Sequence, residues 1–207
     1  MKRQAAFGAM ALLGVGIGTA PDTHAAFVAT MTEVGPNVVV TGSGSIDLAG
    51  LIINPDATNG LPPSAVWPSA GTILLGPPGT DLSELAQFYI PFSGPSNFGP
   101  GGPTVPSSSG TGDRVGVRQD PAVTGITVPF GYVSGAPLSD SSTYDGATLA
   151  SLGATPGTYV WTWGSGRDAD SFTLDITDHV VATPEPASLA LFATGVLALT
   201  LRRRCGA

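Results

Sequence analysis

The segment Phe172-Thr173-Leu174-Asp175-Ile176 alternates apolar and polar residues over five positions. Successive side chains of a β-strand point to opposite faces, so Phe172, Leu174 and Ile176 would share one face. The segment Tyr159-Val160-Trp161-Thr162-Trp163 has the same period, with aromatic residues at every second position. Both patterns are typical of strands with one buried face.

Further short runs rich in β-branched or aromatic residues occur along the chain, separated by Gly, Pro, Asn and Asp. The expected strands are 26–31, 38–41, 72–75, 87–90, 114–117, 125–128, 158–163 and 171–176. About eight strands at this spacing predict an all-β fold, specifically an antiparallel β-sandwich, with a jelly-roll arrangement as a variant.

Three other segments complete the expected domain. A helical turn or two is expected at 144–152, closed by Gly153. Residues 54–69 carry four prolines and are expected to form a surface loop. In the segment 91–112, 16 of 22 residues are Gly, Pro or Ser, which predicts a long mobile loop, either a solvated connector or a binding lid.

The N-terminus has the pattern of a secretory signal peptide. Lys2 and Arg3 precede an apolar run, and Thr23-His24-Ala25 places small residues where a signal peptidase reads them. Signal peptidase is therefore an expected partner, with cleavage after Ala25. We expect residues 1–25 to be the signal peptide, 26–182 to be the exported domain, and 183–207 to be a separate C-terminal tail.

The exported region is strongly acidic. Between residues 26 and 183 there are thirteen Asp and Glu, three Arg and no Lys, a net charge of about −10. Nucleic acid is therefore not an expected partner. The single cysteine, Cys205, lies in the tail, so no disulfide can stabilise the exported domain.

The C-terminal tail combines three features in order. Pro184-Glu185-Pro186 precedes an uncharged run over 187–201, and Arg202, Arg203 and Arg204 follow at once. Fifteen helical residues would extend roughly 22 Å, shorter than the hydrocarbon core of a bilayer. The three arginines favour a membrane span whose C-terminus is cytoplasmic.

This tail resembles the PEP-CTERM sorting tail. The resemblance rests on Pro184-Glu185-Pro186, the short hydrophobic span and the arginine cluster. It implies that an exosortase-type transpeptidase at the inner membrane cleaves the precursor near Pro184-Glu185-Pro186, and that the upstream domain reaches the cell surface or the exopolysaccharide matrix. A plain C-terminal anchor is the alternative. Residues 130–176 are also similar to a group of exported PEP-CTERM proteins, and that similarity brings no activity with it.

The residue inventory does not favour an enzyme. His179 is the only histidine after Ala25, and the ligands of a zinc site are missing. Aspartates are plentiful enough for the carboxylate pair of a glycan hydrolase, although nothing in their spacing selects a pair. We expect no catalytic residues and no required cofactor.

Two features suggest a binding site for calcium or for a sugar. Asp168 and Asp170 lie two positions apart after Gly164-Ser165-Gly166 and are either turn residues or Ca²⁺ ligands. Tyr159, Trp161 and Trp163 form either a sugar-stacking platform or part of the core, and we favour the core.

Taken together, the sequence predicts a structural or adhesive protein of the cell surface or extracellular matrix. A carbohydrate- or calcium-binding module is the alternative, and a glycan hydrolase or an ice-binding protein is less favoured.

Overall fold

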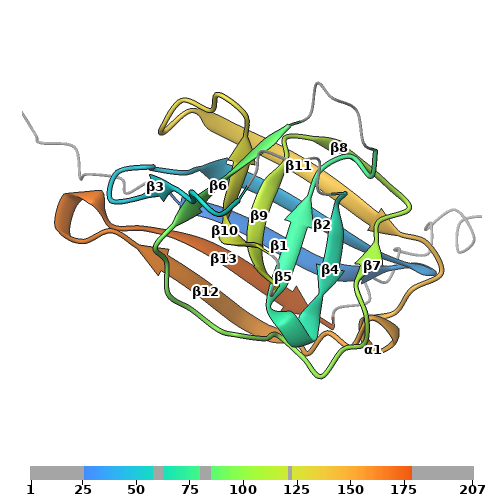
Figure 1. Ribbon diagram of the computed structural model, residues 1–207. Coiled ribbons are helices and arrows are strands. Elements are labelled where there is room, and N and C mark those ends of the chain that lie inside the picture. Colours follow the sequence, from blue (N-terminus) through green and yellow to red (C-terminus); the bar gives the residue numbers. More distant parts are fainter. Residues whose placement is uncertain (1–25, 58–62, 80–84, 121–122, 179–207) are drawn as a thin grey trace, which may run out of the picture.

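Strands account for nearly all of the regular structure in the part of the chain that the structure describes. The computed structural model describes residues 26–57, 63–79, 85–120 and 123–178 (Figure 1). The strands are β1 (Ala26–Val34), β2 (Asn37–Ser45), β3 (Ile52–Ile53), β4 (Ala65–Trp67), β5 (Thr72–Leu75), β6 (Ala86–Ile90), β7 (Val105–Pro106), β8 (Ser109–Gly112), β9 (Val115–Asp120), β10 (Val123–Pro129), β11 (Pro137–Tyr144), β12 (Gly157–Trp163) and β13 (Asp170–Thr177). The helices are α1 (Leu149–Leu152) and the 3₁₀ turns η1 (Pro68–Ala70) and η3 (Gly166–Asp168). The predicted all-β class is confirmed.

The first sheet joins the beginning and the end of the described chain. Its strand order is β12-β13-β1-β2-β11-β8. β13 lies antiparallel to β12 but parallel to β1, with Ala26 opposite Ser171 and Thr32 opposite Thr177. The expectation of a purely antiparallel arrangement was therefore wrong for this pair. A parallel neighbour requires a long connection, and here almost the whole domain lies between the two strands.

The second sheet has the order β3-β6-β10-β9-β5-β4-β7, with antiparallel pairing throughout. Figure 1 shows it as a layer in front of the first sheet. Both sheets contribute to one hydrophobic core, as illustrated by Phe172 and Leu174 from β13 together with Ile73 and Val117 from β5 and β9. Apolar side chains of the two inner faces are thereby removed from water, which is the main force that stabilises such a domain.

Each of the eight predicted strand segments lies in or overlaps an observed strand. In β13 the buried side chains are Asp170, Phe172, Leu174 and Ile176, so the predicted alternation is confirmed. The sequence did not reveal β11, because Ser and Asp dominate it and only Leu138 and Tyr144 are apolar. It becomes a strand because β2 and β8 pair with its two edges.

Two expected segments need correction. The helix expected at 144–152 is one turn, Leu149–Leu152, because β11 continues through Tyr144 and Thr148 caps the turn. Gly153 ends it with a left-handed backbone, as expected. The expected surface loop at 54–69 contains β4, where Ala65 and Val66 are buried.

The segment 91–112 is not the unstructured connector that its composition predicts. It contains β7, which pairs with β4, and β8, which pairs with β11. The connection that precedes β7, residues 91–104, is here called the covering loop. It buries Phe98 completely in the core cluster. One large apolar side chain thus holds in place a segment whose average composition is similar to that of a linker.

The expected signal peptide (1–25), the expected sorting tail (183–207) and His179 lie outside the described residues. In the part of the chain that the structure describes, no helix is long and apolar enough to cross a membrane.

Candidate functional site

The covering loop is bonded directly to strand β12. The backbones of Ser93 and Thr162 exchange two hydrogen bonds, with N···O distances of 2.9 and 2.7 Å. The indole Nε1 of Trp161 donates to the Pro95 carbonyl oxygen at 3.0 Å, and Gln119 Nε2 from β9 donates to the same oxygen at 2.9 Å. The loop is therefore tied to both sheets along its first half.

Phe98 fixes the second half of the loop. Its ring meets Tyr159 and Trp161 edge-on, with centroid separations of 5.9 and 6.5 Å. Its backbone N–H donates to the Pro68 carbonyl of η1 at 2.9 Å, and its carbonyl accepts from the Thr155 N–H at 2.9 Å. One residue thus holds the loop, η1 and the segment before β12 in fixed positions.

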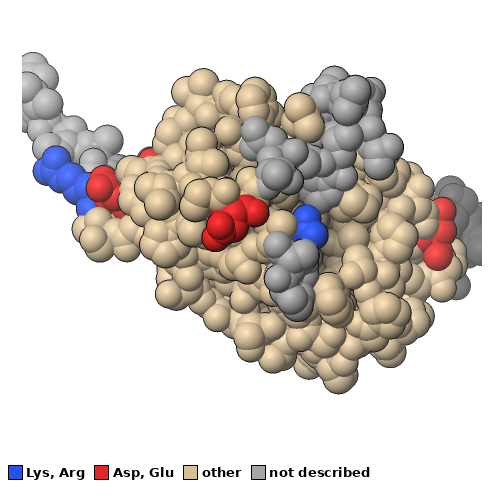
Figure 2. Space-filling model, viewed as in Figure 1, with Lys and Arg blue, Asp and Glu red and all other residues tan. Residues whose placement is uncertain are grey.

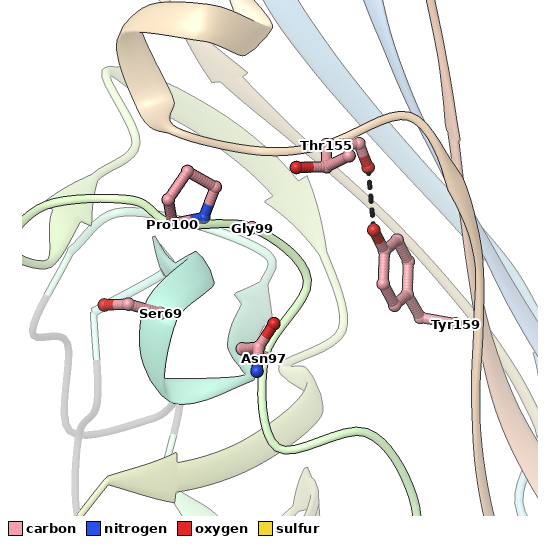
Figure 3. Close-up of a pocket in the computed structure, with 6 residues that line it drawn as sticks. All are labelled: Ser69, Asn97, Gly99, Pro100, Thr155 and Tyr159. Carbon is pink, nitrogen blue, oxygen red and sulfur yellow. Dashed lines mark hydrogen bonds between the residues drawn. The ribbon is translucent and has the colours of Figure 1, made fainter.

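These three elements enclose an open depression of about 540 Å³, called here the tyrosine depression. Its lining residues are Ser69, Asn97, Gly99, Pro100, Thr155 and Tyr159 (Figure 3). Tyr159 and Thr155 stand on one side, and Asn97, Gly99 and Pro100 of the loop stand on the other. None of these residues carries a charge, and the lining combines one aromatic ring with an amide and two aliphatic hydroxyls.

The three aromatic residues that alternate along β12 do not share one environment: Trp161 and Trp163 belong to the core, and Tyr159 lines the depression. Trp161 is 0 % exposed and Trp163 is 4 % exposed, and both belong to the core cluster. Their indoles are therefore inaccessible to a sugar, and these two residues do not form a stacking platform. Tyr159 is half-buried, and its hydroxyl donates to the Thr155 carbonyl at 3.0 Å.

Asp168 and Asp170, which the sequence offered as turn residues or calcium ligands, have different surroundings. Asp168 is exposed on η3. Asp170 is buried, and its carboxylate accepts backbone N–H bonds from Asp47 and Ser171, both at 2.6 Å. Across 26–57, 63–79, 85–120 and 123–178, no three His, Cys, Asp or Glu residues gather into a group suited to a metal ion.

A buried acid that the sequence did not single out lies on β11. Asp140 faces inward between Leu138 and Ser142. Neither of its carboxylate oxygens makes a hydrogen bond of good geometry among the described residues, although the backbone of Gly42 on β2 lies close enough to lower the pKa slightly. Burial raises its pKa from 3.8 to about 8, and the charge of Asp113 adds to the rise. Asp140 is therefore mainly protonated at neutral pH.

A second, smaller hollow of about 290 Å³ lies over β4 and β5. Trp67, Thr72, Leu74 and Arg118 contribute to it, together with Pro63, Ala65 and Thr104. The Arg118 guanidinium lies 5.8 Å from the centroid of the Phe88 ring, a cation–π distance. This hollow contains a charged group, unlike the tyrosine depression.

The comparison with protein families identifies the tail. Residues 182–204 match the family model described as the PEP-CTERM protein-sorting motif. The tail of this chain therefore carries the PEP-CTERM sorting motif. The matched range includes Pro184-Glu185-Pro186 and the cluster Arg202, Arg203 and Arg204 that the sequence singled out. The expected resemblance is confirmed.

The PEP-CTERM motif indicates an exported protein that is processed by an exosortase-type system and made as a membrane-anchored precursor. It begins five positions after β13 ends at Thr177. Comparisons with curated proteins and with solved structures gave no match. The role of the domain therefore has to be argued from its own geometry.

Of the residues that line the tyrosine depression, sequence reasoning named only Tyr159. Ser69, Asn97 and Thr155 come from three separate segments that no local pattern connects. The available signal was Phe98, a large apolar residue in a stretch of Gly, Pro and Ser, which implies that the segment is anchored to a core.

Proposed function

We propose that this PEP-CTERM protein is a structural or adhesive component of the cell surface or the extracellular matrix, associated with exopolysaccharide. In this proposal the two-sheet domain is a β-sandwich scaffold that binds rather than catalyses. The sorting tail delivers it to the outside of the cell, and the domain then holds its position against mechanical load.

The observation that carries this proposal is the place of β13 in its sheet. β13 has seven paired positions with β1 on one side and seven with β12 on the other. It is also the strand that leads into the sorting motif, with four residues, 178–181, between them. Four residues reach at most roughly 14 Å. A pull on the tail is therefore transmitted to β13 almost directly.

A load directed along β13 would have to slide the strand past both neighbours. Many ladder hydrogen bonds would then be stretched together, whereas a load perpendicular to the strand would open them one after another. The buried side chains of Phe172, Leu174 and Ile176 would also have to leave the core. This placement suits a domain that stays folded while it is held by its C-terminal end.

The proposal is tested in the producing cell with a strain that lacks the chain. The strain is complemented with the full chain, with a chain that ends at residue 181, and with Leu174→Ala. Leu174 is fully buried, and its truncation should destabilise the domain by about 2–5 kcal/mol. Thr173→Ala is the matched control, because Thr173 lies next to Leu174 and is partly exposed on the opposite face.

The measurements are the amount of protein in the matrix fraction and the shear needed to disperse cell aggregates. We expect both to fall without the tail and with Leu174→Ala, and to stay at the wild-type level with Thr173→Ala. Aggregates that need the same shear with and without the chain would contradict a structural or adhesive role.

A further inference from the structure

We propose that the tyrosine depression is a binding site for a neutral saccharide. The inference rests on the proposed function, since it supplies the contact between a matrix protein and a polysaccharide. It assigns the ligand class from the six lining residues Ser69, Asn97, Gly99, Pro100, Thr155 and Tyr159.

Tyr159 provides a ring in a fixed orientation. Its hydroxyl is bonded to the Thr155 carbonyl at 3.0 Å, and its ring packs edge-on against Phe98. A pyranose has one face that presents mainly C–H groups, and such a face packs well against an aromatic ring. Because the tyrosine is already held in place, little side-chain freedom is lost when a sugar binds.

Polar groups that suit sugar hydroxyls lie on both sides of the depression. The Asn97 side chain is exposed and offers both an acceptor oxygen and a donor NH₂ group. Among the described residues, its amide nitrogen makes a single long contact, at 3.5 Å with Ser96 Oγ. The Ser69 and Thr155 hydroxyls can each donate and accept. Figure 3 shows these groups distributed around the depression rather than on one side of it.

The charge distribution selects a neutral ligand. No lining residue is charged, and the exported region carries about ten net negative charges. Figure 2 shows the lower part of the visible face, over η1 and α1, without charged side chains among the described residues. An anionic glycan would meet repulsion without a compensating cation, whereas a neutral one would not. The volume of about 540 Å³ falls in the range of small-molecule sites and fits a short oligosaccharide segment.

The walls of the depression are formed before any ligand arrives. Phe98 N–H bonds to Pro68, Thr155 N–H bonds to Phe98, and Gly101 N–H bonds to Gly153 at 3.1 Å. These contacts join the covering loop to η1 and to the end of α1. Because the walls are already fixed, no loop has to become ordered when a ligand binds. This lowers the entropic cost of binding a ligand to a shallow surface.

The test uses the processed protein purified from the extracellular pool and ligand-observed NMR titrations. The probes are neutral tetrasaccharides of glucose, mannose and galactose, with a galacturonate tetrasaccharide as the anionic comparison. We expect at least one neutral probe to bind and the anionic probe to bind more weakly. No binding of any neutral probe at millimolar concentration, or tighter binding of the anionic probe, would overturn the proposal.

Substitutions of the lining residues test whether the saccharide binds in the tyrosine depression. Asn97→Ala should weaken binding about three- to tenfold, the size expected for one lost hydrogen bond. Tyr159→Ala should weaken it about tenfold or more, and Tyr159→Phe, which keeps the ring, should stay within about threefold of wild type. Val160→Ala is the control, since Val160 is exposed on the other face of β12.

The thermal unfolding midpoint of each variant separates lost binding from lost folding. Asn97 is exposed, so Asn97→Ala should unfold at the wild-type temperature, and this variant tests the site even if Tyr159→Ala does not fold. Unchanged binding by Asn97→Ala, or full binding by a folded Tyr159→Ala, would overturn the assignment. The result is independent of the cell-aggregation assay, because purified protein can bind a sugar whether or not the chain strengthens the matrix.

Discussion

The indole nitrogen of Trp161 donates a hydrogen bond to the carbonyl oxygen of Pro95, at 3.0 Å. This bond joins the inner face of β12 to a loop composed mainly of Gly, Pro and Ser. The indole is fully buried, and its ring meets Phe172 edge-on at 5.9 Å in addition to Phe98. The order of the covering loop, and with it the shape of the tyrosine depression, therefore depends on this tryptophan.

The first prediction concerns Trp161 itself. Trp161→Ala should lower the free energy of unfolding by about 3–5 kcal/mol, the usual range for truncating a buried large aromatic residue. Urea denaturation of the processed protein measures it. Val160→Ala, on the exposed face of the same strand, should change the free energy by no more than about 0.5 kcal/mol. Equal effects of the two substitutions would show that Trp161 is not part of the core.

The second prediction concerns the close approach of the loop to Trp161. A Cβ atom at Gly94 would overlap the indole and lie 2.9 Å from the Trp161 Cα, whereas a Cβ at Gly102 would meet nothing within 4 Å. Gly94→Ala should therefore destabilise the domain by about 1–3 kcal/mol through overpacking. Gly102→Ala should be neutral or stabilising by up to about 1 kcal/mol. Denaturation midpoints of the two variants decide it, and a neutral Gly94→Ala would mean that the loop lies farther from β12.

A third prediction follows from Asp140, which is 8 % exposed. Its raised pKa means that the folded state keeps a proton that the unfolded chain releases above pH 3.8. The contribution of Asp140 to the free energy of unfolding is therefore greatest below pH 3.8. This contribution falls as the pH rises and is lost above about pH 8.

Asp140→Asn removes this titration. Thermal unfolding between pH 4 and 9 should show a shallower decline for the variant than for the wild type, and the variant should be the more stable protein at pH 9. Parallel pH profiles for the two proteins would contradict the raised pKa of the buried acid on β11.

How far the sequence predicted this fold depends on how each strand is stabilised. β13 and β12 carry alternating apolar side chains, and the pattern alone identified them. β11 has Ser, Asp or Thr at five of its eight positions, and its structure depends on hydrogen bonds to β2 and β8, which no local pattern reveals. The parallel pairing of β1 with β13 is likewise a long-range relationship, since the two strands lie at opposite ends of the described chain.

The site was predicted only in part, for a related reason. Tyr159 was named because it belongs to an aromatic row, but Trp161 and Trp163 of that row serve the core. The covering loop was expected to lack structure, because average composition gives no weight to the one residue, Phe98, that anchors it. Asn97 lines the depression because the neighbouring Phe98 anchors the loop there, so the sequence alone could not identify Asn97 as a candidate ligand contact.

The most direct test of the central claim, that this is a folded domain delivered and processed through a PEP-CTERM tail, is the intact mass of the extracellular protein. The account predicts a species that begins at Ala26 and ends close to Pro184-Glu185-Pro186, with the arginine cluster absent. Recovery of extracellular chains that continue through Ala207 would contradict it.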